Sequence, residues 1–157
     1  MTRAVSTALS TTVLALLTVV LAAVLGAGTA GIATDAADGG TTTVALSATA
    51  TADGTVRLVN RGGTALDTRT LRVRVLVDGE RLDHQPPVPF FAAEGFHGGP
   101  TGAFNPAADP TWEVGESASF RVADTNHPTL APGRTVTVRV YREGTPVGTA
   151  EATVRKG

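Results

Sequence analysis

The chain contains no cysteine, a single lysine and only seven aromatic residues among 157. The absence of cysteine excludes a disulfide framework, a catalytic thiolate and a cysteine-ligated zinc ribbon. Because the formal net charge is only −1, nothing in the composition favours binding to nucleic acid or to an anionic membrane surface. The chain also lacks a G-x-S-x-G elbow, a P-loop and a Rossmann fingerprint, so we expect no enzymatic activity and no cofactor.

Metal-ligand patterns are scarce as well. Each of the three histidines, His84, His97 and His127, lacks a second ligand-type residue at a metal-binding spacing. The oxygen-bearing side chains between Asn105 and Glu116 do not have the compact spacing of a calcium loop. We therefore expect neither a metal site nor catalytic residues, and we interpret the histidines and the DTNHP run (124–128) as surface loop residues.

The N-terminal part of the chain lacks charge. No charged residue occurs between Ala4 and Thr34, and the stretch VLALLTVVLAAVLGAG (13–28) is almost entirely apolar. A helix rises ~1.5 Å per residue, so this run is long enough to cross a hydrocarbon core of ~30 Å. One interpretation is a secretory signal cleaved near the small residues AGTAGIA, and another is an uncleaved membrane anchor. Arg3 before the run and Asp35 and Asp38 after it favour a cytoplasmic N-terminus.

A third interpretation comes from the start of this segment. The stretch RAVSTALSTTVLALLTVVLAAVLG, which begins at Arg3, resembles the N-terminus of archaeal type IV pilin-like proteins, especially haloarchaeal ones. In that family a dedicated peptidase removes a short basic leader in front of the apolar helix. The resemblance implies a leader over 1–4, with Arg3 and Ala4 before the cut and Val5 as the new N-terminus. The chain departs from bacterial pilins at Leu9, where those proteins carry a glutamate.

The resemblance also implies a helix over 5–34 that anchors the protein in the membrane and then packs inside a filament. A helix that is apolar all round suits both environments. Small residues allow helices to approach closely, and the residues that we expect at such contacts are Ala22, Ala23, Gly26, Ala27 and Gly28.

Beyond a linker over 35–40, the hydrophobic period changes to two. In TLRVRVLVDG (70–79) Arg72 and Arg74 alternate with apolar residues, and the inward positions along the chain are Val56, Leu58, Leu71, Val73, Val75, Val77, Ala118, Phe120, Val122, Val136, Val138, Val140, Ala150, Ala152 and Val154. Such alternation indicates half-buried antiparallel strands. Asp53-Gly54 and Asp78-Gly79 predict hairpin turns, and two more breaks are expected at 61–63 and 143–144. We predict an all-β exodomain over 41–157, an immunoglobulin-like antiparallel β-sandwich with at least six strands.

This second part carries a resemblance of its own. The stretch VRLVNRGGTALDTRTLRVRVLVDGE (56–80) resembles the opening of archaeal pilin-like and archaellum-associated exodomains. The resemblance implies a single-pass protein of the cell membrane with an extracellular exodomain. Its partners are expected to be a pilin-type leader peptidase and other pilin-like subunits in a pilus or archaellum-like filament. Two alternatives stay open: an archaellum stator-type protein that binds the surface layer without polymerising, and a conventionally secreted binding module.

The segment PPVPFFAAEGFHGGPTGAFNPAADPTW (86–112) holds six of the nine prolines and five of the seven aromatics. We predict a long loop over 83–112, because prolines remove hydrogen-bond donors from a central strand. Its aromatics form either a flap that covers the core or an interaction surface: Phe90, Phe91, Phe96, Phe104 and Trp112. Adjacent side chains in an extended segment point to opposite sides, so we expect one of Phe90 and Phe91 in the core and the other toward a partner.

Overall fold

The computed structural model describes residues 43–157. The expected leader with its processing residues Arg3, Ala4 and Val5, the apolar segment with its small packing residues, and the linker all lie outside the described residues. Within 43–157, no helix is both long and apolar enough to cross a membrane.

The described part of the chain is all-β, as the alternation predicted. Its elements, in chain order, are β1 (Ala45–Thr51), β2 (Thr55–Gly62), β3 (Leu66–Asp67), the 3-10 turn η1 (Thr68–Thr70), β4 (Leu71–Val77), β5 (Glu80–Arg81), β6 (Phe96–Thr101), the 3-10 turn η2 (Gly102–Phe104), β7 (Thr111–Trp112), β8 (Ser117–Val122), β9 (Thr135–Arg142) and β10 (Thr145–Arg155).

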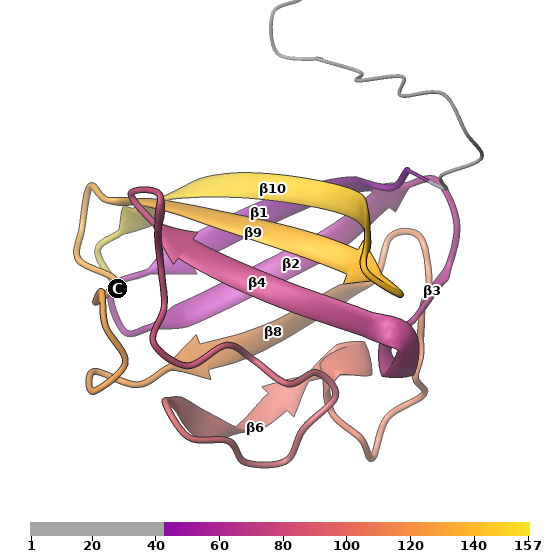
Figure 1. Cartoon of the computed structure of the whole chain (residues 1–157), viewed down its shortest axis with the longest axis horizontal. Helices are drawn as coiled ribbons and strands as arrows, with labels where there is room; N and C mark the ends of the chain where they lie inside the picture. Colours follow the sequence, from indigo (N-terminus) through magenta and orange to yellow (C-terminus); the bar gives the residue numbers. More distant parts are fainter. Residues whose placement is uncertain (1–42) are drawn as a thin grey trace, which may run out of the picture. The chain divides into compact units, whose positions relative to one another are not determined.

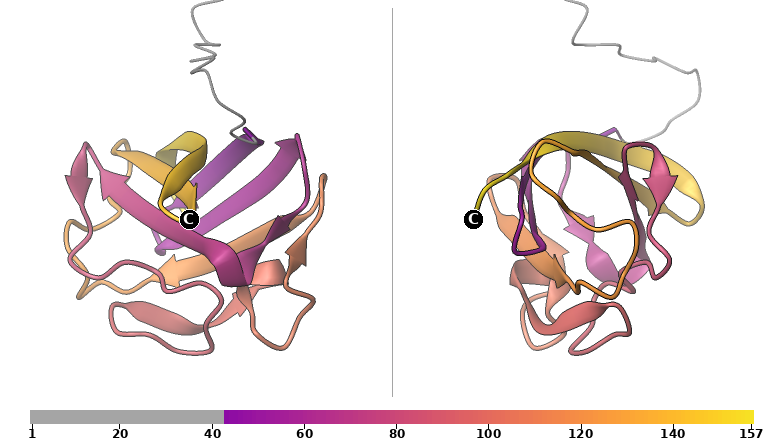
Figure 2. Two further views of the ribbon diagram at one scale, coloured as in Figure 1. Left: turned by 45° about the vertical axis from the view of Figure 1, so that its right-hand side comes forward. Right: turned by 90° about the vertical axis from the view of Figure 1, so that its left-hand side faces the viewer.

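Eight strands are hydrogen-bonded in the order β5-β4-β9-β10-β1-β2-β8-β6, while β3 and β7 form a separate pair. All neighbours in the large sheet are antiparallel except β1 and β10, which run parallel where Ala50 lies beside Val154. Most of β10 pairs with β9, and its last residues pair with β1. The sheet therefore continues through β10 and folds over, so that β4 and β9 lie on one side of the domain and β2 and β8 on the other (Figures 1 and 2).

One hydrophobic core lies between these two halves of the sheet. The predicted inward residues are buried, with Ala152 half-buried, and those with no exposed surface at all are Val56, Leu58, Val75, Val77, Ala118, Val136, Val138 and Val140. Arg72 is exposed between its buried neighbours, as the period of two requires. The core consists mainly of valine and alanine, which leaves room for larger side chains from elsewhere in the chain.

Two tight turns join neighbouring strands. Asp78 and Gly79 have φ of 49° and 82° between β4 and β5, and Glu143 and Gly144 have φ of 50° and 86° between β9 and β10. Two successive residues with positive φ make the type I′ turn whose twist suits a hairpin. The Asp78-Gly79 prediction is therefore confirmed, and the break predicted at 143–144 is a second hairpin turn of the same kind.

The segment predicted as a long loop over 83–112 contains short regular elements as well. This segment contains β6, η2 and β7, and β6 pairs with β8 at the end of the sheet. An edge strand needs hydrogen-bond donors on one side only, so Pro100 is tolerated there. The register of β6 against β8 is interrupted between His97 and Thr101, where two glycines and this proline lie.

Candidate functional site

Four of the five aromatics in the 86–112 segment are buried in the core. Phe104 and Trp112 have no exposed surface, and Phe90 and Phe96 are also buried. The ring of Phe96 lies edge-on to that of Phe120 on β8, with centroids 5.7 Å apart, and Phe104 lies 6.1 Å from the same ring. The segment is therefore packed onto the sheet by its own aromatic side chains, and these fill the space that valine and alanine leave.

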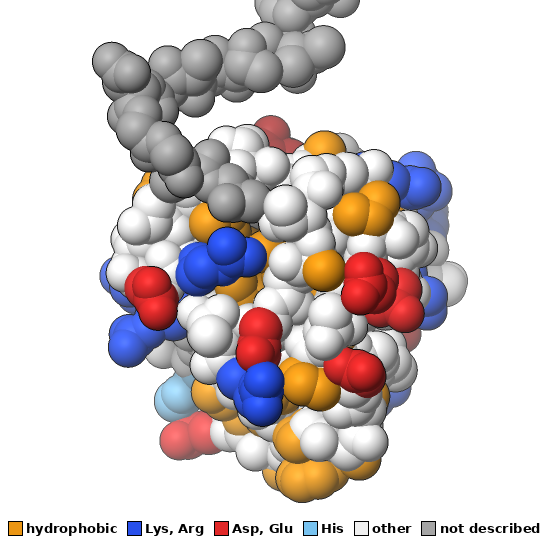
Figure 3. All heavy atoms as spheres, turned by 90° about the vertical axis from the view of Figure 1, so that its right-hand side faces the viewer, with side chains coloured by type: hydrophobic (Ala, Val, Ile, Leu, Met, Phe, Trp, Pro, Cys, Tyr) orange, Lys and Arg blue, Asp and Glu red, His pale blue; other side chains and the backbone are white. Residues whose placement is uncertain are grey.

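Phe91 is the exception, with 63% of its surface exposed. The backbone N–H of Phe90 donates to the carbonyl oxygen of Phe104 at 3.0 Å, which holds Phe90 inward, and the next side chain emerges on the opposite side. One buried and one exposed ring is the division that we expected for the adjacent phenylalanines; a partner for Phe91 stays a prediction. Figure 3 shows hydrophobic side chains gathered at the lower end of the domain, where Figure 1 places β6.

The backbone around Phe91 is held from both sides. Gly99 N–H donates to the Phe91 carbonyl oxygen at 3.1 Å, and Phe96 N–H donates to the Ala93 carbonyl oxygen at 3.1 Å. A side chain at Gly98 would place its Cβ 3.4 Å from the Phe91 carbonyl oxygen, so the two segments approach closely. We call residues 91–99 the Phe91 tip.

Asn126 fastens the base of this tip. Its side chain has no exposed surface; Oδ1 accepts from His84 N–H at 3.0 Å, and Nδ2 donates to the carbonyl oxygens of His84 and Gly95 at 2.9 and 3.1 Å. Gly95 has φ of +82°, and a Cβ there would lie 2.7 Å from Nδ2. Only glycine fits this position without displacing Asn126.

Our interpretation of the whole 124–128 run as surface residues was thus wrong for Asn126. Nothing in the local sequence distinguishes this asparagine from its exposed neighbours, because its three hydrogen-bond partners come from residues 84 and 95. A buried side-chain amide satisfied by distant backbone is visible only after the loops have come together.

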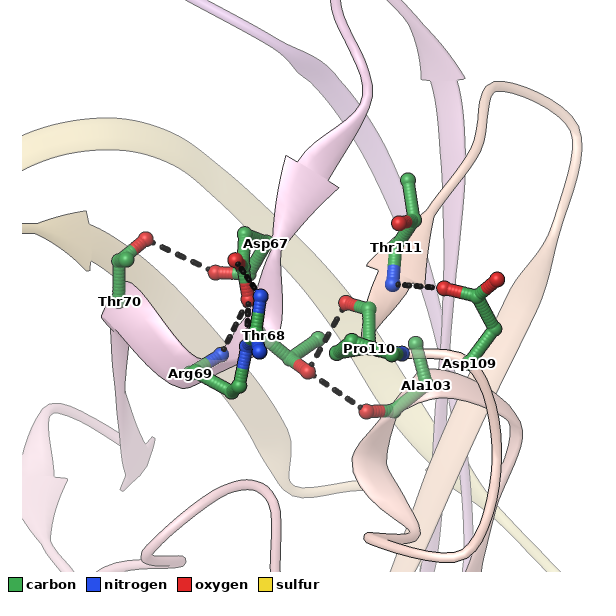
Figure 4. A network of polar contacts seen from close by, with 8 residues as sticks. All are labelled: Asp67, Thr68, Arg69, Thr70, Ala103, Asp109, Pro110 and Thr111. Atoms are coloured by element: carbon green, nitrogen blue, oxygen red, sulfur yellow. Dashed lines mark hydrogen bonds and ion pairs between the residues drawn. The ribbon is translucent and has the colours of Figure 1, made fainter.

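A second polar network fixes the other end of the segment (Figure 4). Thr68 in η1 has no exposed surface, and its Oγ1 lies 2.8 Å from the Ala103 carbonyl oxygen and 3.1 Å from that of Pro110. Thr68 N–H also donates to the Pro110 carbonyl oxygen at 2.9 Å. The Asp67 carboxylate accepts from the side chain and the backbone N–H of Arg69, and these bonds lower its pKa.

The last residue of β7 is held in the same way. Trp112 donates its indole Nε1–H to the Glu116 carbonyl oxygen at 2.9 Å, and Asn60 Nδ2 donates to the carbonyl oxygens of Thr64 and Trp112 at 3.0 and 3.2 Å. Asn60 is buried without exposed surface. Both ends of the 86–112 segment are thus fixed, and the exposed ring of Phe91 is presented by an ordered backbone.

Ionisable side chains near the tip are few. His84 Nε2 lies 3.7 Å from Glu94 Oε1, with the two side chains 42% and 85% exposed, and His97 is exposed on β6. In residues 43–157, no three histidine, aspartate or glutamate side chains lie close enough together to hold a metal ion. The most exposed large hydrophobic side chain of residues 43–157 is that of Phe91.

The search of protein families finds no match to this chain, and the search of curated proteins finds none either.

Proposed function

We propose that this chain is a surface protein of the archaeal type IV pilin-like kind. In this proposal the segment over 5–34 anchors the chain in the membrane and later packs against copies of itself or related subunits. Residues 41–157 form the extracellular domain, an immunoglobulin-like β-sandwich. The strand pairing supports this description, because β1, β2, β8 and β6 form one half while β4, β9 and β10 form the other.

One observation supports the proposal more than the others: an uncharged run from Ala4 to Thr34 follows Arg3, and an all-β domain follows the run in the sequence. An early cut leaves such a run attached to the domain, whereas an ordinary signal cut removes it. The mechanism is assembly driven by burial of apolar surface, with no chemical turnover.

The Phe91 tip is the proposed contact to a neighbouring subunit. Burying an exposed phenylalanine contributes about 1.5–3 kcal/mol. Because hydrogen bonds already order the backbone of the tip, little conformational entropy is lost when a partner binds. Exposed Val114 on the turn after β7 provides a matched apolar control far from this tip in sequence.

The first experiment is to determine the N-terminal residue of the mature protein by mass spectrometry of the native cell-surface fraction. A terminus at Val5 is expected. A terminus near Asp35 would overturn the proposal in favour of a conventionally secreted binding module, and an intact Met1 or Thr2 would leave a simple membrane anchor.

The second experiment tests assembly. Electron microscopy of cells that produce Phe91→Ser should show fewer filaments than cells that produce Val114→Ser. Complete absence of filaments from the wild type, together with co-purification of surface-layer protein, would instead support the stator-type alternative.

A further inference from the structure

Four arginines lie on the outer face of β4, β5 and β9: Arg72, Arg74, Arg81 and Arg139. The register places Arg74 directly opposite Arg139 on the neighbouring strand. Like charges directly opposite one another destabilise a sheet. Among the described residues, no carboxylate lies within ion-pair distance of any of the four. The ion pairs of this part of the chain involve other side chains. The folded domain therefore keeps four neighbouring arginines that no ion pair among the described residues neutralises.

Two adjoining hollows share three of these arginines. One, of about 390 Å³, lies between β4 and the segment over 85–88, and its lining includes Val73, Val88 and the prolines between Gln85 and Val88. The other, of about 580 Å³, lies over β9 and includes Tyr141 and Glu143. The guanidinium carbon of Arg74 is 5.8 Å from the centre of the Tyr141 ring. We call the first hollow the β4 edge groove.

The backbone of β4 borders this groove. Val75 N–H donates to Gln85 Oε1 at 2.7 Å, and the Val75 carbonyl oxygen accepts from Gln85 Nε2 and from Leu82 N–H, both at 3.1 Å. The side-chain amide of Gln85 thus pairs with Val75 as the peptide group of a neighbouring strand would. Alternate residues of a strand direct their backbone groups to the same side. The N–H and C=O of Val73 therefore face the same edge.

No hydrogen-bond partner is present there for Val73 within residues 43–157. The short strand β5 pairs only with Leu76 and Val77, and the chain then leaves the edge. An open strand edge can accept a further strand. In Figure 1, β4 lies at the front of the domain, and the chain after β5 passes along its lower side.

We propose that the β4 edge groove binds an extended acidic segment of a partner protein, which adds to the sheet as an antiparallel strand beside β4. In that pairing, the residue opposite Val73 exchanges both backbone hydrogen bonds with it and points its side chain inward. The partner residues opposite Arg72 and Arg74 point outward. They form the non-hydrogen-bonded pairs, in which the two side chains lie closest to each other. The segment that fits alternates apolar and acidic side chains.

Two features favour a peptide over another polyanion. A strand edge offers N–H and C=O groups in the spacing of a second peptide backbone, which a nucleic acid or an anionic polysaccharide does not match. Glu143 lines the adjoining hollow and would repel a uniformly negative polymer. The inference concerns the domain alone and does not depend on how the chain is anchored.

The test uses the full-length chain in detergent micelles and a fluorescent peptide of four Val-Glu repeats, with binding followed by anisotropy. The double variant Arg72→Glu with Arg74→Glu should weaken binding at least ~10-fold. The matched control, Arg57→Glu with Arg121→Glu, reverses two exposed strand arginines on the other half of the sheet and should stay within about twofold of the wild type. Fluorescence of buried Trp112 verifies that both variants are folded.

A second pair of peptides tests the backbone pairing. Methylation of the valine amides, which face β4 in this register, should abolish binding, whereas methylation of the glutamate amides should leave it within about threefold. Equal affinity for both methylated peptides would overturn strand addition. Equal weakening by the two arginine double variants, or polyphosphate binding as tight as that of the peptide, would overturn the acidic-segment assignment.

Discussion

Removal of the Asn126 side chain is the sharpest test of how the Phe91 tip is held. In Asn126→Ala, the His84 N–H and the His84 carbonyl oxygen lose their partner, while the Gly95 carbonyl oxygen keeps only the bond from Ala123 N–H. A hydrogen bond contributes about 1 kcal/mol net, and a buried group left without a partner costs about 1–3 kcal/mol. Because His84 and Gly95 are half-buried, water satisfies some of these groups. We expect the free energy of unfolding to fall by about 2–4 kcal/mol.

The chain provides its own probe for this measurement. Trp112 is the single tryptophan and has no exposed surface, so its fluorescence reports unfolding of the domain even in the full-length protein. For a domain of this size, the expected loss lowers the unfolding temperature by an amount on the order of 10 °C. Hydrogen exchange at the His84 amide should accelerate in parallel, because its acceptor is gone.

Asn105→Ala serves as the matched control. The Asn105 side chain makes two hydrogen bonds, to the Pro100 carbonyl oxygen at 3.0 Å and from Ala107 N–H at 2.9 Å, but the residue is only half-buried. Its loss should cost about 1 kcal/mol or less. If Asn126→Ala destabilised the domain no more than this control does, the assignment of Asn126 as the fastener of the tip would be refuted.

Three further predictions follow from single contacts, and each is measured by the same unfolding assay. Gly54 and Gly79 both have positive φ, but their surroundings differ. A Cβ at Gly54 would lie 2.1 Å from a backbone oxygen, whereas nothing lies within 4 Å of a Cβ at Gly79. Gly54→Ala should therefore lower the free energy of unfolding by at least ~2 kcal/mol more than Gly79→Ala, and similar losses would contradict the close contact. Phe90→Ala should lower the free energy of unfolding by about 3–5 kcal/mol, whereas Phe91→Ala should leave it within about 0.5 kcal/mol of the wild type. Comparable losses would contradict the assignment of Phe90 as buried and Phe91 as exposed. Hydrogen bonds from the Arg134 side chain and the Thr135 N–H lower the pKa of Asp78 below 3.8. The stability that this carboxylate contributes is therefore present above its unfolded pKa and is lost as the pH falls through its folded pKa. Asp78→Asn should reduce the loss of stability on acidification below about pH 4, and an unchanged pH profile would argue against this carboxylate.

The candidate site shows where prediction from the sequence reached its limit. The division into one buried and one exposed phenylalanine at positions 90 and 91 was predicted from their adjacency. The adjacency did not reveal which of the two would be buried, because the buried ring is the one that packs against Phe96. The ring centres of Phe90 and Phe96 are 5.7 Å apart. Asn126 was misassigned for the same reason, since all three of its side-chain partners are more than thirty residues away in the sequence.

The sequence by itself determined which side of each predicted strand faces the core and where the tightest turns lie. A side chain's direction in a strand follows from the local backbone, and a type I′ turn depends on two adjacent residues such as Asp78 and Gly79. Only the tertiary structure decided that β1 lies beside β10, that β6 occupies an edge and that Val73 of β4 lines the groove. Strand pairing depends on how the whole sheet folds over its core, and several partners for each strand satisfy the same alternation of side chains.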